Sequence, residues 1–246
     1  MTEADSYRAE TARLFEGWEA RRGSIGMSEV RTVTIDHSAG SFIRDGVVCP
    51  DEWFASGVRP LYLLKEAYGD GGWDLGADHL LTGGVIKKSR MWRRVSEWTY
   101  GIIHTTAEGS PAYSSLPVFD RYGNEYLRKI AVVNIKKSHG APDSDMQEIL
   151  AYAEFDREYL RRQFELCAPT VIICGYTASA LDIIMDVKMR EPRNREQFYH
   201  ITLNGRQVLA LDYWHPANQY PAIMNYYGLM GIYRESLKEQ SGHAEY

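Results

Sequence analysis

Four short runs of apolar residues mark this chain, at residues 61–64, 130–135, 170–174 and 207–211. Each run is rich in Val, Ile or Leu, and none alternates strictly with polar residues. Compact runs of this kind are typical of strands that are covered on both faces of a parallel sheet. We therefore expect four buried parallel strands.

Helical patterns lie between and around these runs. Apolar residues recur at close to helical spacing in residues 89–103, and further helices are expected over residues 1–22, 145–167, 177–187 and 226–239. Strands that alternate with helices predict an α/β fold, a three-layer αβα sandwich around a central four-stranded parallel sheet. We expect a single domain over residues 1–246, in which residues 1–50 form a helical or irregular extension.

The residues after each run are the candidates for chemistry, because ligands of parallel sheets bind at the carboxyl ends of the strands. Glu66 follows the first run, Asn134 lies within the second, and His215 follows the fourth. Each has an ordinary structural explanation when taken alone: a capping acid, an amide bonded to a loop, or a structural histidine. Together they place a carboxylate, an amide and an imidazole at three strand ends, and an amide carries the donors and acceptor that read a pyrimidine edge.

Charge alone argues weakly against a nucleic-acid partner. The chain has 246 residues and a formal net charge of −5, whereas DNA binding depends on neutralising phosphates. Three basic clusters change this picture, although solvated surface faces explain such clusters too. The clusters are Lys87, Lys88, Arg90, Arg93 and Arg94; Lys136 and Lys137; and Arg190, Arg193 and Arg195.

Cysteine usage and hydropathy narrow the class of protein further. Cys49, Cys167 and Cys174 are odd in number and form no C-x-x-C pair, so neither a disulfide framework nor a structural zinc site is expected. No apolar run approaches the roughly 18 residues that span a membrane, and the acidic N-terminus is unlike a signal peptide. We expect a cytoplasmic protein with no membrane partner, no metal and no cofactor.

The order of these motifs resembles the uracil-DNA glycosylase superfamily over roughly residues 59–221. Residues 64–69 (LKEAYG) are similar to its water-positioning motif, residues 133–137 (VNIKK) to its second-strand motif, residues 168–175 to its third strand, and residues 215–217 (HPA) to its last motif. The proline of the first motif is missing here, and so are the cysteines that hold an iron–sulfur cluster in one branch. We therefore expect no cluster.

This resemblance implies a monofunctional DNA glycosylase, which flips a pyrimidine out of DNA and hydrolyses its bond to the sugar, leaving an abasic site. Glu66 would position the water and stabilise the sugar cation, with Asp70 as a second candidate. His215 would donate to the base O2, and Asn134 would hydrogen-bond the base edge.

The resemblance also implies a stacking surface and a DNA-binding face. Tyr68 or Trp73 would stack on the flipped base, and Gln219 or Tyr220 would fill the gap left in the duplex. Phosphate contacts are expected from Lys87, Arg90, Arg93, Arg94, Lys136 and Lys137. We expect a monomer that binds DNA and needs no protein partner.

The substrate expectation comes from the stretch that follows the first motif. Residues 70–74 (DGGWD) are long and glycine-rich for a tight uracil pocket, so a pyrimidine with a bulky C5 group is expected. Some prokaryotic members of the superfamily defend against phages by excising hypermodified cytosines, such as hydroxymethylated or glucosylated ones.

Four alternatives stay open. They are a uracil-DNA glycosylase of base-excision repair, a non-catalytic module that binds modified bases, a lyase that uses a lysine nucleophile such as Lys65, Lys136 or Lys137, and an unrelated nucleotide-binding α/β enzyme. The last alternative lacks both glycine-rich phosphate-binding motifs, G-x-G-x-x-G and G-x-x-x-x-G-K-[ST].

Overall fold

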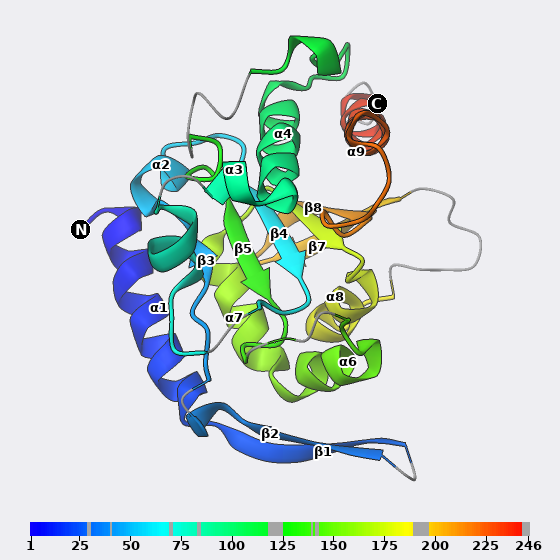
Figure 1. Cartoon of the computed structure of the whole chain (residues 1–246). Helices are drawn as coiled ribbons and strands as arrows, with labels where there is room; N and C mark the ends of the chain where they lie inside the picture. The colour runs from blue at the N-terminus through cyan, green and yellow to red at the C-terminus, as the bar shows by residue number, and fades with distance from the viewer. Residues whose placement is uncertain are drawn as a thin grey trace.

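The computed structural model describes residues 1–28, 31–39, 41–68, 71–82, 85–117, 125–138, 140, 143–188 and 197–242. A six-stranded mixed sheet lies at its centre, with strands in the order β3-β5-β4-β6-β8-β7 and helices on both faces (Figure 1). The strands are β3 (Gly46–Val47), β4 (Pro60–Leu64), β5 (Ala131–Asn134), β6 (Val171–Gly175), β7 (Phe198–Leu203) and β8 (Arg206–Tyr213).

The expectation of a four-stranded parallel sheet is wrong for the sheet as a whole. The four predicted runs are β4, β5, β6 and β8, and β4 pairs in parallel with β5 and β6, as β6 does with β8. Antiparallel strands extend the sheet at both edges, β3 beside β5 and β7 beside β8. A two-residue turn joins β7 to β8, and its residues Asn204 and Gly205 have positive φ angles of 49° and 73°. Asn-Gly is the preferred pair for such a hairpin turn.

The central sheet and the helices on its two faces form three layers, with one apolar cluster on each face of the sheet. Alternate side chains of β4 face opposite ways: Leu61 and Leu63 belong to one cluster, and Tyr62 and Leu64 to the other. The first cluster is covered by α1 (Glu3–Glu19), α6 (Met146–Phe155), α7 (Arg157–Cys167) and α8 (Ala178–Met185), and α2 (Pro50–Phe54) joins it through its buried Trp53. The second is covered by α3 (Val85–Lys88), α4 (Arg90–His104) and α9 (Ala222–Gly242) (Figure 1).

The single helix expected over residues 145–167 is two helices that meet at Asp156. Asp156 leaves the helical conformation, with φ −101° and ψ 13°. Its carboxylate is fully buried, and Oδ2 lies 2.8 Å from Nε2 of His37. The chain therefore bends where a buried carboxylate pairs with a distant histidine.

Residues 1–50, expected to form a helical or irregular extension, contain a helix and also contribute a strand to the central sheet. They comprise α1, a hairpin of β1 (Arg22–Ser28) and β2 (Arg31–Asp36), the short helix η1 (His37–Ala39) and strand β3 of the central sheet. Trp18 and Ile35 are fully buried in the first cluster. These residues therefore form part of the domain's core. Among the residues described, no helix combines the length and apolarity that a membrane span requires.

Candidate active site

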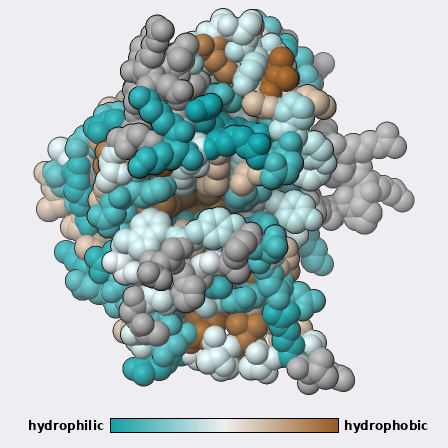
Figure 2. All heavy atoms as spheres, viewed as in Figure 1, coloured by the Kyte–Doolittle hydropathy of each residue, from teal (hydrophilic) through white to brown (hydrophobic). Residues whose placement is uncertain are grey.

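A pocket of about 980 Å³ opens at the carboxyl ends of the central strands. It brings together Glu66 after β4, Asn134 at the end of β5 and His215 after β8, the three side chains predicted to meet there. Figure 2 shows a hollow on this face of the molecule, with apolar residues in its depth and polar residues around it. The parallel pairing of β5, β4, β6 and β8 is what gathers these strand ends.

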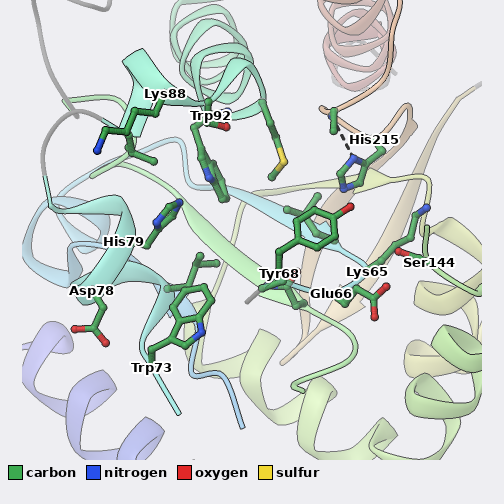
Figure 3. Close-up of a pocket in the computed structure, with 18 of the residues that line it drawn as sticks. Lys65, Glu66, Tyr68, Trp73, Asp78, His79, Lys88, Trp92, Ser144 and His215 are labelled. Atoms are coloured by element: carbon green, nitrogen blue, oxygen red, sulfur yellow. Dashed lines mark hydrogen bonds between the residues drawn. The ribbon is translucent and has the colours of Figure 1, made fainter. Parts of the chain in front are cut away.

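His215 is a neutral hydrogen-bond donor at neutral pH. Burial, and to a smaller extent the positive charge of Lys65, lowers the pKa of His215 from 6.5 to about 4. The backbone N–H of Ala217 donates to His215 Nδ1 at 3.2 Å, as the dashed line in Figure 3 marks. A neutral ring whose Nδ1 accepts carries its proton on Nε2, so this nitrogen has an N–H to donate.

Arg94 holds the loop that carries His215. Its side chain is buried, and its guanidinium donates to three backbone carbonyl groups of this loop, at Pro216 (2.8 Å), Asn218 (2.9 Å) and Tyr220 (3.0 Å). The prediction that Arg94 binds DNA phosphates is therefore wrong, because the residue is 3% exposed and its two terminal nitrogens donate inside the protein. Its position on α4 instead couples that helix to the His215 loop.

Asn134 is held by a carboxylate that the sequence did not single out. Asp45 Oδ2 accepts hydrogen bonds from the backbone N–H of Asn134 at 2.8 Å and from its Nδ2 at 3.2 Å. This fixes the plane of the amide and uses one of its two N–H groups. The second N–H and the carbonyl oxygen are the groups with which Asn134 can meet a ligand in the pocket.

Lys137 belongs to the same buried cluster, so its predicted contact with DNA is wrong. Its side chain is 0% exposed, and Nζ lies 2.5 Å from Asp45 Oδ1 and 2.9 Å from Gln163 Oε1. It also lies over the Trp18 ring, 4.9 Å from the centroid. Asp45 and Gln163 carried no sequence signal, since Asp45 is 89 residues from Asn134 and sits in no recognisable motif.

Lys136 lies between two carboxylates. Its Nζ is 3.1 Å from Glu66 Oε2 and 2.9 Å from Glu148 Oε1. Burial alone would lower the pKa of Lys136, but the hydrogen bonds that it donates to Glu148 and Glu66 outweigh burial and raise the pKa. Lys136 is therefore a cation whose charge is compensated by carboxylates of the protein. Little uncompensated positive charge is left to attract a DNA phosphate.

The backbone of Gly140 packs closely against Glu66, a contact that the sequence did not indicate. The side chain of Glu66 is 5% exposed. A Cβ atom at Gly140 would stand 2.4 Å from Glu66 Cγ, and the N–H of Gly140 donates to the Ala67 carbonyl at 2.7 Å. Only glycine allows this approach without a shift of the carboxylate.

Aromatic rings form one wall of the pocket. Trp73 packs edge-on to His79 at 6.1 Å between ring centroids, and His79 to Trp92 at 6.3 Å. Figure 3 shows Tyr68 between this aromatic wall and the side of the pocket that holds His215. Trp73 and Tyr68, the two residues predicted to stack on a base, thus both line the pocket, and so does His79 on the π-helix η2 (Leu75–Leu80).

The remaining predicted residues lie on the surface near the pocket. Lys87, Arg90 and Arg93 are exposed, and Arg90 donates to Gln219 Oε1 at 2.7 Å. Tyr220 is 52% exposed. Asp70 and the cluster of Arg190, Arg193 and Arg195 lie outside the described residues.

Neither a metal site nor a known family identifies this pocket. Within the described part of the chain, no three His, Cys, Asp or Glu side chains gather closely enough to hold a metal ion. No model of a known protein family matches the chain, and no curated protein matches it either. Function is therefore inferred from the residues of the pocket.

Proposed function

We propose that this protein is a monofunctional DNA glycosylase that takes a flipped, modified pyrimidine into the pocket and hydrolyses its N1–C1′ bond. The observation that carries the proposal is the presence of a neutral histidine donor, a carboxylate and an oriented amide in one pocket, on His215, Glu66 and Asn134. Breaking this bond develops positive charge on the sugar and negative charge on the base. The pocket offers the carboxylate of Glu66 to the positive sugar and the N–H donor of His215 to the negative base.

His215 acts on the departing base. As the N1–C1′ electron pair moves onto the base, O2 becomes negative, and the Nε2–H of His215 stabilises it. The ring stays neutral because of its low pKa, so it donates a hydrogen bond and keeps its proton. Because Arg94 and Ala217 fix the loop and the ring, the donor is aimed before the reaction begins.

Glu66 acts on the water and the sugar. Its carboxylate stabilises the developing sugar cation and accepts a proton from the attacking water, whose oxygen bonds to C1′. That proton then passes to the leaving base through solvent, which gives a free base and an abasic sugar. Positioned acid–base groups of this kind contribute about 10²–10⁴-fold to a rate.

The size of the pocket favours a substituted base. At about 980 Å³ it lies at the upper end of the roughly 300–1,000 Å³ that ligand pockets span. Asn134 would read the pyrimidine edge, and the aromatic wall leaves room for a C5 substituent. These features support a hydroxymethylated or glucosylated cytosine as the substrate.

The lysines near the strand ends support water as the nucleophile. Lys136 is held protonated by two carboxylates, and a protonated amine cannot attack C1′. The side chain of Lys137 is fully buried and paired with Asp45. A lyase mechanism would need a free amine beside the sugar, which neither Lys136 nor Lys137 provides. Lys65 lines the pocket, so the search for a covalent protein–DNA adduct tests this third lysine.

The experiment is base release followed by mass spectrometry. The protein is incubated with uracil-containing DNA, unmodified DNA, and DNA carrying hydroxymethylated or glucosylated cytosines, alongside His215→Ala. We expect a free modified base from the parent, much less from the variant, and no borohydride-trapped protein–DNA adduct. Release of uracil alone would point to a repair enzyme. No release from any of these DNAs would contradict the proposal.

A further inference from the structure

Four aromatic side chains are exposed in the segments that follow the central strands, and one of them, Tyr68, lines the pocket. Their exposed fractions are 61% for Tyr68, 52% for Tyr176, 46% for Trp214 and 52% for Tyr220. All four follow the carboxyl ends of central strands: Tyr68 comes after β4, Tyr176 after β6, and the other two after β8. We call these four residues the aromatic rim.

Side-chain contacts connect the aromatic rim to the site. The rings of Trp214 and Tyr220 pack edge-on with centroids 5.3 Å apart. Lys65 Nζ lies 5.5 Å from the Tyr176 ring centroid, and the same lysine acts electrostatically on His215. Tyr68 lines the pocket itself. The rim therefore extends outward from the proposed reaction centre.

Tyr176 is held in an unfavourable backbone conformation while its ring stays in solvent. Its φ angle is +61°, a region that bulky residues rarely adopt and that costs on the order of 1–3 kcal/mol. Its backbone N–H donates to the carbonyl oxygens of both Cys174 and Tyr213 at 2.8 Å, which keeps the strained turn in place. Burial of the ring would explain such strain, but the ring is half exposed. The turn therefore holds the Tyr176 ring at the surface beside Lys65, where a base can stack on it.

The distribution of charge favours a single strand as that ligand. Of the six basic residues expected to bind phosphates, only Lys87, Arg90 and Arg93 are exposed; Arg94 and Lys137 are buried, and Lys136 is compensated by carboxylates. The net charge is −5, whereas duplex binding relies on many phosphate contacts. Binding of single-stranded DNA adds stacking against aromatic rings to its phosphate contacts, at about 1–3 kcal/mol per base, so it can manage with fewer cations.

We propose that the aromatic rim stacks the bases on either side of the flipped pyrimidine, so that the protein acts on single-stranded DNA. This inference rests on the proposed function of the pocket. Lys65 and Arg90 provide the nearby cations for the backbone, and the rings provide most of the affinity. Stacking is tolerant of sequence because every base has a π face, so the pocket alone selects the modified base.

The first arm of the test measures binding of a fluorescent 12-nucleotide DNA with ordinary bases, single-stranded or annealed, by anisotropy. We expect Tyr176→Asn and Trp214→Ala each to weaken single-strand binding by roughly 5- to 100-fold, and Trp214→Phe to restore most of it. Asn tolerates positive φ, so Tyr176→Asn keeps its fold, which its melting temperature checks. Tyr227→Ala is the matched control, because Tyr227 is similarly exposed, at 47%, but lies within helix α9 and not after a strand end.

The second arm measures base release from the same proteins on modified single strands and duplexes. Equal binding of the rim variants and the parent, or equal use of duplex and single strand, would overturn the inference and leave the proposed function standing. Ring-dependent binding of single strands without release of any base would contradict the proposed function while supporting the rim as a stacking surface.

Discussion

Two lysine–carboxylate pairs lie just after β5, one buried in the protein interior and one at the wall of the pocket. On one side, Lys137 pairs with Asp45 in a fully buried cluster. On the other, Lys136 pairs with Glu66 at the wall of a large pocket, and its side chain is 12% exposed. The two lysines are neighbours in the chain, and consecutive side chains near a strand end point to opposite faces.

This difference separates residues that hold the fold from residues that face a ligand. The Asp45 cluster has no room for a substrate, and its polar atoms bond one another. The Glu66 side has the pocket, the donor of His215 and the aromatic wall. A basic dipeptide in the sequence therefore does not tell which of its lysines meets a substrate, because the fold assigns them different roles.

The largest effect on stability is expected at Lys137. Lys137→Met leaves the Asp45 carboxylate buried without its cation, which should cost about 3–5 kcal/mol of the free energy of unfolding. Lys136→Met, the comparison variant, should cost less, because Lys136 is 12% exposed and its second partner Glu148 is 33% exposed, whereas Lys137 and Asp45 are both 0% exposed. Urea denaturation measures both. Equal losses would show that the two sides of β5 do not differ as described.

On the pocket side, the largest effect on rate is expected at His215. His215→Ala should lower the rate of base release by about 10²–10³-fold, because a preorganised donor to the base oxygen is lost. His215→Gln retains an N–H donor and should lose less. Single-turnover release assays on the substrate identified by mass spectrometry provide the rates. An unchanged rate in His215→Ala would remove this residue from the mechanism.

The low pKa of His215 also predicts how stability depends on pH. The folded pKa of about 4 lies below the unfolded value of 6.5, so the unfolded chain binds the proton first. The neutral His215 ring contributes its full share to the free energy of unfolding above pH 6.5. This contribution falls as the pH falls and is gone below about pH 4, a change of about 3 kcal/mol. The difference in unfolding free energy between parent and His215→Gln should change by this amount between pH 7 and pH 4. A constant difference would contradict the buried, neutral ring.

A smaller effect is expected at Arg94. Arg94→Met should lower the free energy of unfolding by about 2 kcal/mol and slow base release, because the His215 loop loses three hydrogen bonds to a charged donor. Arg93→Met, at the exposed neighbouring position, should stay within about 0.5 kcal/mol. Thermal melting and release rates distinguish them. Similar losses at the two positions would contradict the anchoring role of Arg94.

The centre of the fold was predictable because it follows from burial. Strands β4, β5, β6 and β8 are covered on both faces, so their sequences are continuous apolar runs. The edge strands were not predicted: β3 has two residues, and β7 alternates between buried and exposed positions. The Asn204-Gly205 pair was a usable signal for the β7–β8 hairpin.

The candidate site was predictable where strand ends decide the positions. The carboxyl ends of parallel strands lie at one edge of the sheet, and this rule was enough to predict that Glu66, Asn134 and His215 line one pocket. Asp45 was not found, since only the three-dimensional fold brings it to Asn134. Arg94 lies four residues before the buried Trp98, which is one helical turn, so helical spacing signalled its burial although its charge suggested the surface.

The most direct test of the central claim compares Glu66→Gln with the parent protein in base release, with unfolding curves recorded on the same samples. Glu66→Gln removes the negative charge at the pocket while leaving Lys136 its second partner, Glu148. We predict that the variant folds like the parent and releases base at least about 10²-fold more slowly. Release at the parent rate by a folded Glu66→Gln protein would contradict the assignment of this pocket as the site of hydrolysis.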